Sequence, residues 1–302
     1  MEKIEDHNKV KSWIILIVLA IIWGSSFILM KRGMDAYTPY QVAAMRVLIA
    51  ASVLFPFIFN KIKNIEIKYW KYLMIVGVFG NTIPAFLFTI AETEISSALA
   101  GILNALTPIF TLAIAFALFK TRIRWVNTLG VIIGFVGAVG IIFINAEGTM
   151  DFTNVYAILP VVATIFYAVS INTIRNFLHP LPSVVISGAA LLPVGIGCGI
   201  YLFTTDVIAR TAGTGGAESL IYVAILAIFG TAISIVFFND LIKMSGPIFA
   251  SSVTYLIPIV AIMWGIFDNE ILSWLHFVGL AVILFGVYLV NKKRKAEIVS
   301  NN

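Results

Sequence analysis

The sequence has few charged residues and a single cysteine. Of its 302 residues, only 12% are Asp, Glu, Lys or Arg, about half the share that is usual in soluble domains. In contrast, 60% of the residues are hydrophobic and the mean hydropathy is +1.01. Cys198 lies inside an apolar run, which excludes a disulfide framework within one chain. The sequence therefore predicts an integral membrane protein.

Residue patterns typical of catalysis and of metal or nucleotide binding are absent. His7, His179 and His276 lie far apart and lack the spacing of metal ligands, so we predict no metal site and no cofactor. No nucleophile and base occur as a recognisable pair, and no glycine-rich loop resembles a phosphate cradle. These absences argue against an enzyme and exclude an ATP-driven pump in this chain alone. An intramembrane enzyme remains the alternative from another functional class.

Ten apolar runs are long enough to cross a bilayer, and short polar segments separate them. The connection at 204–218 is the exception, because it is longer and rich in Gly and Thr. We predict an all-α membrane protein with ten transmembrane helices at 13–30, 38–59, 69–91, 95–119, 125–144, 155–174, 183–203, 219–241, 247–267 and 274–291.

The positive charges lie unevenly between the two sides that these helices define. If the N-terminus is cytoplasmic, sixteen Lys and Arg residues fall on the cytoplasmic side and three on the opposite side. Because insertion places positive loops in the cytoplasm, both termini are predicted to be cytoplasmic. This topology also explains the net charge of +5, so we expect membrane lipid and a small-molecule substrate as partners rather than nucleic acid. The oligomeric state is not indicated.

The second half of the chain repeats the first. At an offset of 150 positions, Gly80 matches Gly230 and Pro108 matches Pro258, and the match extends over three predicted helices. The repeats are 1–150 and 151–302, with five helices each. Because five is odd, the second repeat enters the membrane from the opposite side, and such inverted repeats are typical of transporters that work by alternating access.

The fourth and ninth predicted helices contain these two prolines. A proline lacks the backbone N–H that would bond to the carbonyl four residues earlier, so Pro108 and Pro258 should free the carbonyls of Asn104 and Thr254. Freed carbonyl groups at membrane depth need protein or water as partners. We therefore predict a cavity where the two interrupted helices meet.

The polar residues at depth are mild and suit a neutral or zwitterionic ligand, although each one alone is better explained by helix packing, except Asn104, Thr107, Thr254 and Tyr255, which flank the paired prolines. Aromatic residues in helices one and six could form walls of the same site, although lipid-facing belts also use such residues. The predicted substrate-binding residues are Trp23, Ser26, Asn81, Asn104, Thr107, Tyr167, Ser234, Thr254 and Tyr255.

Arg46 and Glu92 are predicted to be structural or gating residues, together with the two prolines. A central arginine costs roughly 2.5–3.5 kcal/mol on insertion scales, so Arg46 needs a partner such as Glu92 or Glu94, or else it faces the cavity and an anionic group of the substrate. Glu92 ends the third helix, where it is either solvated or a proton-sensitive gate.

Several motifs resemble the EamA family of the drug/metabolite transporter superfamily. They are WGSSF at 23–27 followed by Lys31, Arg46 in AAMRVLIAA, AETEISSALAGILNALTPIFT at 91–111 and IPIVAIMWGIFDNEILSW at 257–274. The resemblance covers nearly the whole chain. One departure is Lys120, where the family often has a glutamate that Glu270 supplies in the second half.

The resemblance implies a bacterial inner-membrane carrier of small metabolites, often an exporter of amino acids or toxic compounds. It places the site between helices 1, 3 and 4 of one half and helices 6, 8 and 9 of the other. Neither the substrate nor the coupling ion is fixed, and proton exchange and facilitated diffusion both remain open. A channel-like facilitator is a further alternative, although the polar residues gather at two helices rather than forming a continuous stripe.

Overall fold

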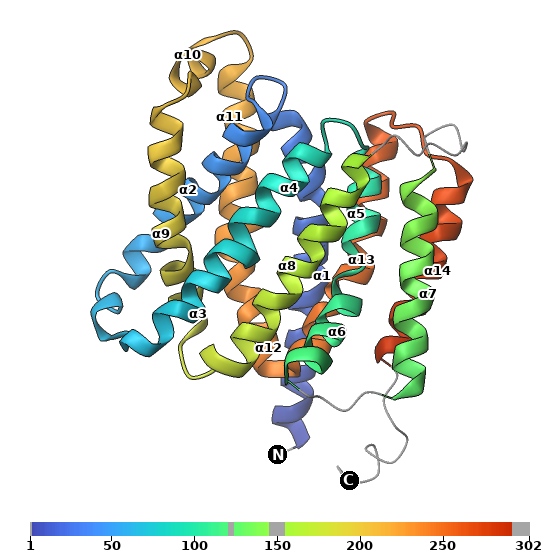
Figure 1. Cartoon of the computed structure of the whole chain (residues 1–302). Helices are drawn as coiled ribbons and strands as arrows, with labels where there is room; N and C mark the ends of the chain where they lie inside the picture. The colour runs from blue at the N-terminus through green and yellow to red at the C-terminus, as the bar shows by residue number, and fades with distance from the viewer. Residues whose placement is uncertain (1, 120–123, 145–154, 292–302) are drawn as a thin grey trace.

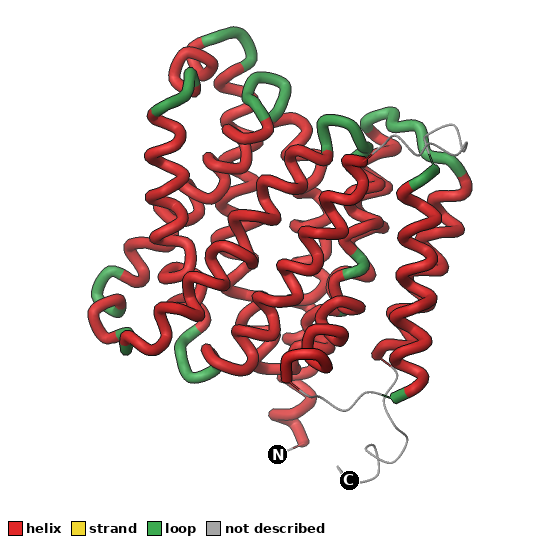
Figure 2. Tube along the Cα trace, viewed as in Figure 1, coloured by secondary structure: helices red, strands yellow, loops and turns green. Residues whose placement is uncertain are grey.

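The computed structural model describes residues 2–119, 124–144 and 155–291, and within these ranges the chain is helical and has no strand. The helices run side by side as a bundle, with loops at its two ends (Figures 1 and 2). The elements are α1 (Glu2–Gly33), α2 (Pro39–Ile58), η1 (Ile62–Asn64), α3 (Ile67–Gly77), η2 (Val78–Thr82), α4 (Ile83–Ala91), α5 (Ser97–Asn104), α6 (Thr107–Phe119), α7 (Trp125–Ile142), η3 (Val155–Ala157), α8 (Ile158–Thr173), η4 (Ile174–Leu178), α9 (Ser183–Phe203), α10 (Val207–Ala212), α11 (Gly216–Ala227), η5 (Ile228–Ile233), α12 (Ser234–Ser251), α13 (Val253–Phe267) and α14 (Trp274–Asn291).

The membrane-spanning helices match the ten predicted runs. In the described part of the chain, nine helical segments are long and apolar enough to cross a membrane, and Trp274–Val290 is a shorter tenth. The connection at 204–218 was predicted to be a loop, but it contains the short helix α10. The predicted repeat boundary at 150, Lys120 and both chain ends lie outside the described residues.

The helix ends follow from local sequence. Thr38 begins α2 with a capping box: its hydroxyl accepts from the Gln41 N–H at 3.2 Å, and the Gln41 side chain accepts from the Thr38 N–H at 3.0 Å. Pro39 is the first helical residue, where a missing N–H costs nothing. The hydroxyl of Ser96 caps α5 by accepting from the Leu99 N–H at 3.1 Å.

Three spanning segments contain wider π-helical turns: η4 ends the sixth span, and η2 and η5 lie at corresponding positions of the third and eighth spans. The third span is continuous from α3 through η2 to α4, and the eighth runs from α11 through η5 to α12. η2 and η5 begin 150 positions apart, at Val78 and Ile228. Such π segments occur preferentially at functional sites.

The two proline-containing spans differ from each other, which corrects the prediction of a matching break. The fourth span is interrupted at 105–106, and Thr107 separates this break from Pro108; the break is the short loop within the bundle (Figure 2). α13 instead continues through Pro258. In the ninth span the turn lies earlier, at Ser252, whose hydroxyl bonds to the Phe249 carbonyl at 2.6 Å.

Glycines allow α7 and α14 to approach closely. A Cβ atom added to Gly130 would lie 2.5 Å from the carbonyl oxygen of Gly286, and one added to Gly286 would lie 2.5 Å from the Gly134 nitrogen. The glycines of the fifth and tenth predicted helices therefore form a contact between the two halves of the chain.

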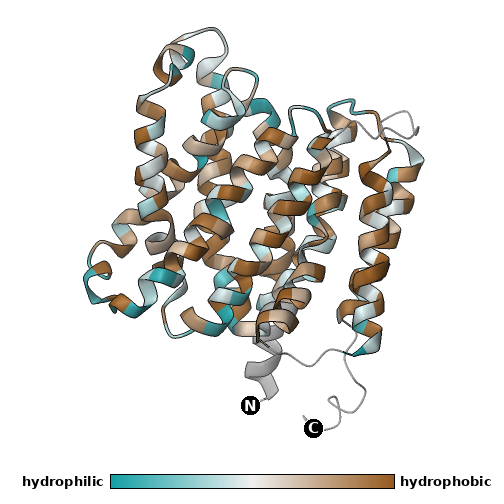
Figure 3. Ribbon diagram, viewed as in Figure 1, coloured by the Kyte–Doolittle hydropathy of each residue, from teal (hydrophilic) through white to brown (hydrophobic). Residues whose placement is uncertain are grey.

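Large apolar side chains remain exposed along the outside of the bundle. Phe203 and Trp125 are 86% and 76% exposed. Hydrophobic residues extend along the full length of the helices in Figure 3, whereas hydrophilic ones concentrate toward their ends. This surface suits the hydrocarbon core of a bilayer, so the chain is a multi-pass membrane protein.

Candidate functional site

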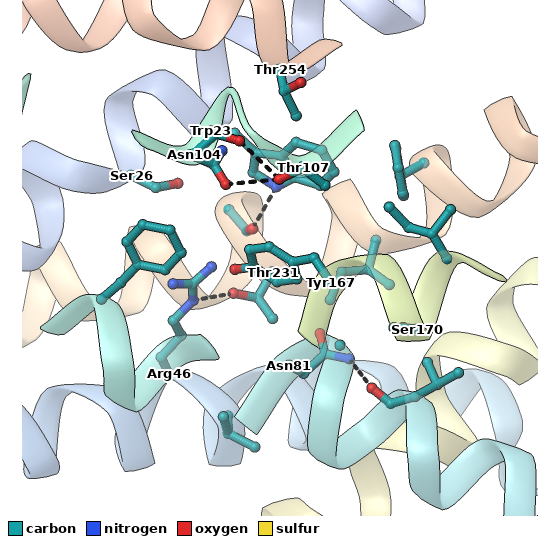
Figure 4. Close-up of a pocket in the computed structure, with 18 of the residues that line it drawn as sticks. Trp23, Ser26, Arg46, Asn81, Asn104, Thr107, Tyr167, Ser170, Thr231 and Thr254 are labelled. Atoms are coloured by element: carbon teal, nitrogen blue, oxygen red, sulfur yellow. Dashed lines mark hydrogen bonds between the residues drawn. The ribbon is translucent and has the colours of Figure 1, made fainter. Parts of the chain in front are cut away.

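A cavity of about 120 Å³ lies within the bundle. Helices from both halves of the chain contribute to its wall (Figure 4). It is lined by Trp23, Ser26, Phe27, Met30, Arg46, Val47, Val76, Gly80, Asn81, Phe88, Asn104, Thr107, Tyr167, Ser170, Ile171, Ile174, Gly230, Thr231, Ile235, Phe238, Asn239 and Thr254.

Many lining residues form pairs at equivalent places in the two halves. On the first helix of each half, the pairs lie 144 positions apart, and on the third and fourth helices they lie 150 positions apart. Equivalent residues of the two sequence repeats therefore line the same cavity. The pairs are Trp23 with Tyr167, Ser26 with Ser170, Phe27 with Ile171, Met30 with Ile174, Gly80 with Gly230, Asn81 with Thr231, Phe88 with Phe238, and Asn104 with Thr254.

The two glycines of one pair contact the two serines of another pair, each across the boundary between the halves. A Cβ atom on Gly80 would lie 2.2 Å from the Ser170 hydroxyl oxygen, and one on Gly230 would lie 2.8 Å from the Ser26 hydroxyl oxygen. The π-helical segments η2 and η5 therefore each present a glycine to the first helix of the other half. The indole of Trp23 strengthens one of these contacts by donating to the Gly230 carbonyl at 3.0 Å.

Seven of the nine predicted substrate-binding residues line the cavity, and two do not. Ser234 is fully buried, and its hydroxyl donates to the Phe229 carbonyl at 2.6 Å. Tyr255 packs against a hydrophobic cluster, and its buried hydroxyl has no hydrogen-bond partner in the described part of the chain. The residues that do line it are Trp23, Ser26, Asn81, Asn104, Thr107, Tyr167 and Thr254.

The two prolines lie outside the set of cavity-lining residues. The Asn104 carbonyl that Pro108 leaves without its helical partner accepts a bond from the Thr107 hydroxyl at 2.8 Å. The expected free carbonyl is therefore satisfied by a neighbouring side chain rather than offered to a ligand.

Arg46 faces the cavity rather than the acidic residues at the helix ends. Its Nε donates to the Thr231 hydroxyl at 2.7 Å, and Nη1 approaches the sulfur of Met30 at 3.6 Å. The ring of Tyr167 lies beside the guanidinium group in Figure 4. No carboxylate of the described residues forms an ion pair with Arg46. Arg46 is also the one charged residue among the described residues that line the cavity.

Glu92 is buried, although its place after the third span suggests a solvated loop. It is 7% exposed, and neither carboxylate oxygen has a hydrogen-bond partner among the described residues. Burial raises the pKa of the Glu92 carboxyl well above its usual range, and the charge of Glu270 adds to this effect, whereas Arg46 and Lys31 oppose it. Glu94, two residues later, is exposed.

Charged residues join three elements at one end of the bundle, which we call the Lys31 end and define by Lys31, Arg32, Asp268 and Glu270. Lys31 lies 2.5 Å from Asp268 and 3.0 Å from Glu270, and Arg32 pairs with Asp268. The Glu270 carboxylate also accepts the backbone N–H groups of Ser97 and Ala98, at 3.0 and 3.1 Å. It therefore connects the end of α1 with the start of α5, where an anion is favoured by the helix dipole.

Carbonyl and hydroxyl groups make the contacts at the opposite end, which we call the Lys243 end and define by Ser12, Leu181, Lys243 and Ser245. The Ser245 hydroxyl donates to the Ser12 hydroxyl at 2.7 Å, and Lys243 donates to the carbonyl of Leu181. No carboxylate of the described chain forms an ion pair with Lys243.

The sequence analysis missed the apolar part of the lining and several polar members. Applying the repeat offsets to the predicted residues would have found Thr231 from Asn81 and Ser170 from Ser26. Gly80 and Gly230 were matched by the repeat but were not predicted to belong to the site. The other missed residues are mostly apolar, and none of them alone differs from an ordinary packing position. They are Phe27, Met30, Val47, Val76, Phe88, Ile171, Ile174, Ile235, Phe238 and Asn239.

The fold and the cavity define a multi-pass helical membrane protein with a small-molecule-sized cavity shared by two matching halves. The model of the EamA-like transporter family matches residues 11–143 and 154–292. The chain belongs to this family. The two matched segments correspond to the two halves that supply the paired lining residues.

Similar proteins from distant organisms carry transporter names. The uncharacterized inner membrane transporter YedA of Escherichia coli K12 is 28% identical over 91% of this chain and 89% of its own length. An uncharacterized transporter of Archaeoglobus fulgidus is 28% identical over 94% of this chain and its own entire length. A protein of known crystal structure shares the fold, with a TM-score of 0.64 and 15% identity over 97% of this chain and 98% of that chain.

Proposed function

We propose that this protein is a secondary transporter that exports small metabolites such as amino acids across the bacterial cytoplasmic membrane. The observation that carries the proposal is the cavity whose lining residues come in equivalent pairs from the two halves. A site between two similar halves can be reached from either side of the membrane when the halves exchange conformations.

The two halves are inverted repeats in this proposal, 1–150 and 151–302, and both chain termini are cytoplasmic. The start of α1 and the end of α14 lie at the same side of the bundle in Figure 1, which supports an even number of crossings. The excess of Lys and Arg on that side supports its cytoplasmic location.

Four residues have supporting roles in the proposed cycle. Pro108 follows the break between α5 and α6, and Pro258 lies within α13, so both are placed in the helices that must move. Arg46 links α2 to the η5 segment through Thr231. Glu92 is the proton-sensitive gate, because a buried carboxyl near Glu270, Arg46 and Lys31 changes its interactions when it ionises.

The test is transport by the purified protein in proteoliposomes, with labelled amino acids and other small metabolites, with and without a pH gradient. We expect saturable uptake and exchange of at least one compound. Movement that never saturates would favour a channel, and chemically altered products would favour an enzyme. Neither movement nor alteration of any compound would contradict the proposal.

The role of Glu92 has its own test in the same vesicles. Glu92→Gln keeps the size of the side chain but removes the titratable group, so the rate of transport should lose its dependence on pH. Glu94→Gln is the matched control, because Glu94 is exposed, and should retain the wild-type pH profile. An unchanged pH profile in Glu92→Gln would contradict the gate.

A further inference from the structure

Arg46 has unused hydrogen-bonding capacity that faces the cavity. A guanidinium group has five N–H donors, and in the described structure Arg46 uses one on Thr231 and directs another at the weak acceptor sulfur of Met30. The charge also has no ion-pair partner in the described part of the chain. A charged group at membrane depth without such a partner is costly unless water or a ligand satisfies it.

The other described residues of the cavity wall carry no charge, so none of them neutralises Arg46 or competes with it for an anionic ligand. Its described polar members are amides, hydroxyls and the Trp23 indole, and aromatic and aliphatic side chains complete the lining. Glu92 is the buried acid whose charge acts on Arg46, but it forms no hydrogen bond with the guanidinium group and is not a lining residue. One positive charge in a neutral wall suits a ligand with one negative charge.

Thr231 holds the guanidinium group in a defined orientation. The Thr231 hydroxyl donates its own proton toward the Leu226 carbonyl at 3.5 Å, which leaves its oxygen lone pairs for the Arg46 Nε–H. Thr231 belongs to the π-helical segment η5, which also accepts the indole N–H of Trp23 at Gly230. Nε is therefore fixed, and the two terminal nitrogens remain available for a two-pronged contact.

The two halves of the chain are unequal at this position. The repeat offset of 143 or 144 positions places Ala189 or Ala190 opposite Arg46, and both alanines are fully buried. The charge at Arg46 therefore occurs in one half only and has no charged equivalent in the other half.

We propose that Arg46 binds the carboxylate of the transported molecule, so that the substrate class is small organic acids and zwitterions bearing one carboxylate. This inference rests on the proposed transport function and names its cargo. The carboxylate accepts from the two terminal nitrogens of Arg46, Thr231 positions the guanidinium group, and the apolar and aromatic walls enclose the remainder of the molecule.

The test compares each acid with its primary amide, which keeps the rest of the molecule but lacks the negative charge of the carboxylate. Binding to the purified full-length protein in detergent is measured for benzoate, L-threonine, L-leucine and L-phenylalanine and for the primary amide of each. We expect at least one acid to bind about 10- to 100-fold more tightly than its amide, because a hydrogen bond to a charged group is worth about that factor. Arg46→Gln should abolish this preference, because the two terminal nitrogens that hold the carboxylate and the positive charge are both lost.

Two further variants make the test independent of whether Arg46→Gln folds. Arg46→Lys keeps the charge but loses the planar fork, so the preference for the acid should fall about three- to tenfold. Thr231→Val removes the acceptor that orients Nε and should reduce the preference less. Arg210→Gln is the matched control, because Arg210 is an exposed arginine paired with Asp206 outside the cavity, and it should bind like wild type.

The outcomes separate this inference from the transport proposal when the same compounds are tested in proteoliposomes. If the wild-type protein moves compounds but treats each acid and its amide alike, the transporter stands and the role of Arg46 is wrong. If acids bind through Arg46 but no compound crosses the membrane, the binding site stands and the transport proposal fails. If no acid binds more tightly than its amide, the role of Arg46 is contradicted.

Discussion

The two ends of the bundle are held together by different chemistry. At the Lys31 end, two acids and two bases connect α1 with the segment between α13 and α14, and Glu270 extends the connection to α5. At the Lys243 end, the corresponding contacts are a pair of hydroxyls and a lysine on a backbone carbonyl. The cavity lies between these ends.

The two acids at the Lys31 end are buried, so the contacts at this end are expected to be much stronger than those at the Lys243 end. The side chains of Glu270 and Asp268 are 4% and 10% exposed, so their interactions are only weakly screened by solvent. The hydroxyl pair at the Lys243 end is neutral and contributes less. We therefore expect the contacts at the Lys31 end to stabilise the bundle more than those at the Lys243 end.

The largest expected effect comes from Glu270→Ala. This change leaves Lys31 and the N–H groups of Ser97 and Ala98 without their carboxylate, so the free energy of unfolding should fall by about 2–4 kcal/mol. Reversible denaturation in mixed micelles measures this loss. Glu94→Ala at an exposed position is the control and should change it by less than about 0.5 kcal/mol. If Glu94→Ala lowered the free energy of unfolding as much as Glu270→Ala, the stabilising role of the Glu270 contacts would be contradicted.

A smaller effect is expected from Lys31→Gln. The Lys31 side chain is 38% exposed, so solvent already weakens its attraction to Asp268 and Glu270, and the loss should be about 1 kcal/mol. The same denaturation experiment at low and high salt checks the origin of this loss. The difference between Lys31→Gln and wild type should shrink in high salt, and a difference independent of salt would argue against an ionic origin.

The smallest effect is expected at the Lys243 end. Ser245→Ala removes the hydroxyl that donates to Ser12, which should cost about 0.5 kcal/mol. A loss as large as that of Glu270→Ala, in the same assay, would show that the neutral contacts hold the bundle as firmly as the ion pairs do.

Sequence alone predicted the helices well because apolar length is a strong signal in a membrane protein. The runs that became α2 and α9 were predicted at 38–59 and 183–203, within one residue of the observed ends. The π-helical segments could not be predicted, since residues such as Val78 and Ile228 fit an ordinary helix equally well. α10 was missed because its turn of helix sits in a segment dominated by Gly and Thr.

The two errors in the predicted site have local physical causes. Ser234 follows directly after η5, and a wider helical turn rotates every later side chain away from the direction that a regular helix would give. Tyr255 is next to Thr254, and adjacent helical residues point about 100° apart; here the Tyr255 side chain packs against a hydrophobic cluster while Thr254 lines the cavity. The burial of Glu92 was equally hidden, because it depends on how α4 packs in the folded bundle.

The most direct test of the central claim is whether the cavity can be reached from both sides of the membrane. Asn104→Cys and Thr254→Cys, each in a Cys198→Ala background, place one thiol at equivalent cavity positions of the two halves. Each is labelled with a membrane-impermeant maleimide in right-side-out and in inside-out vesicles. Controls at exposed positions, Glu66→Cys and Glu94→Cys, report the sidedness of the vesicles. Alternating access predicts that both cavity thiols react from either side, whereas the controls react from one side each; cavity thiols that react from only one side would contradict the account.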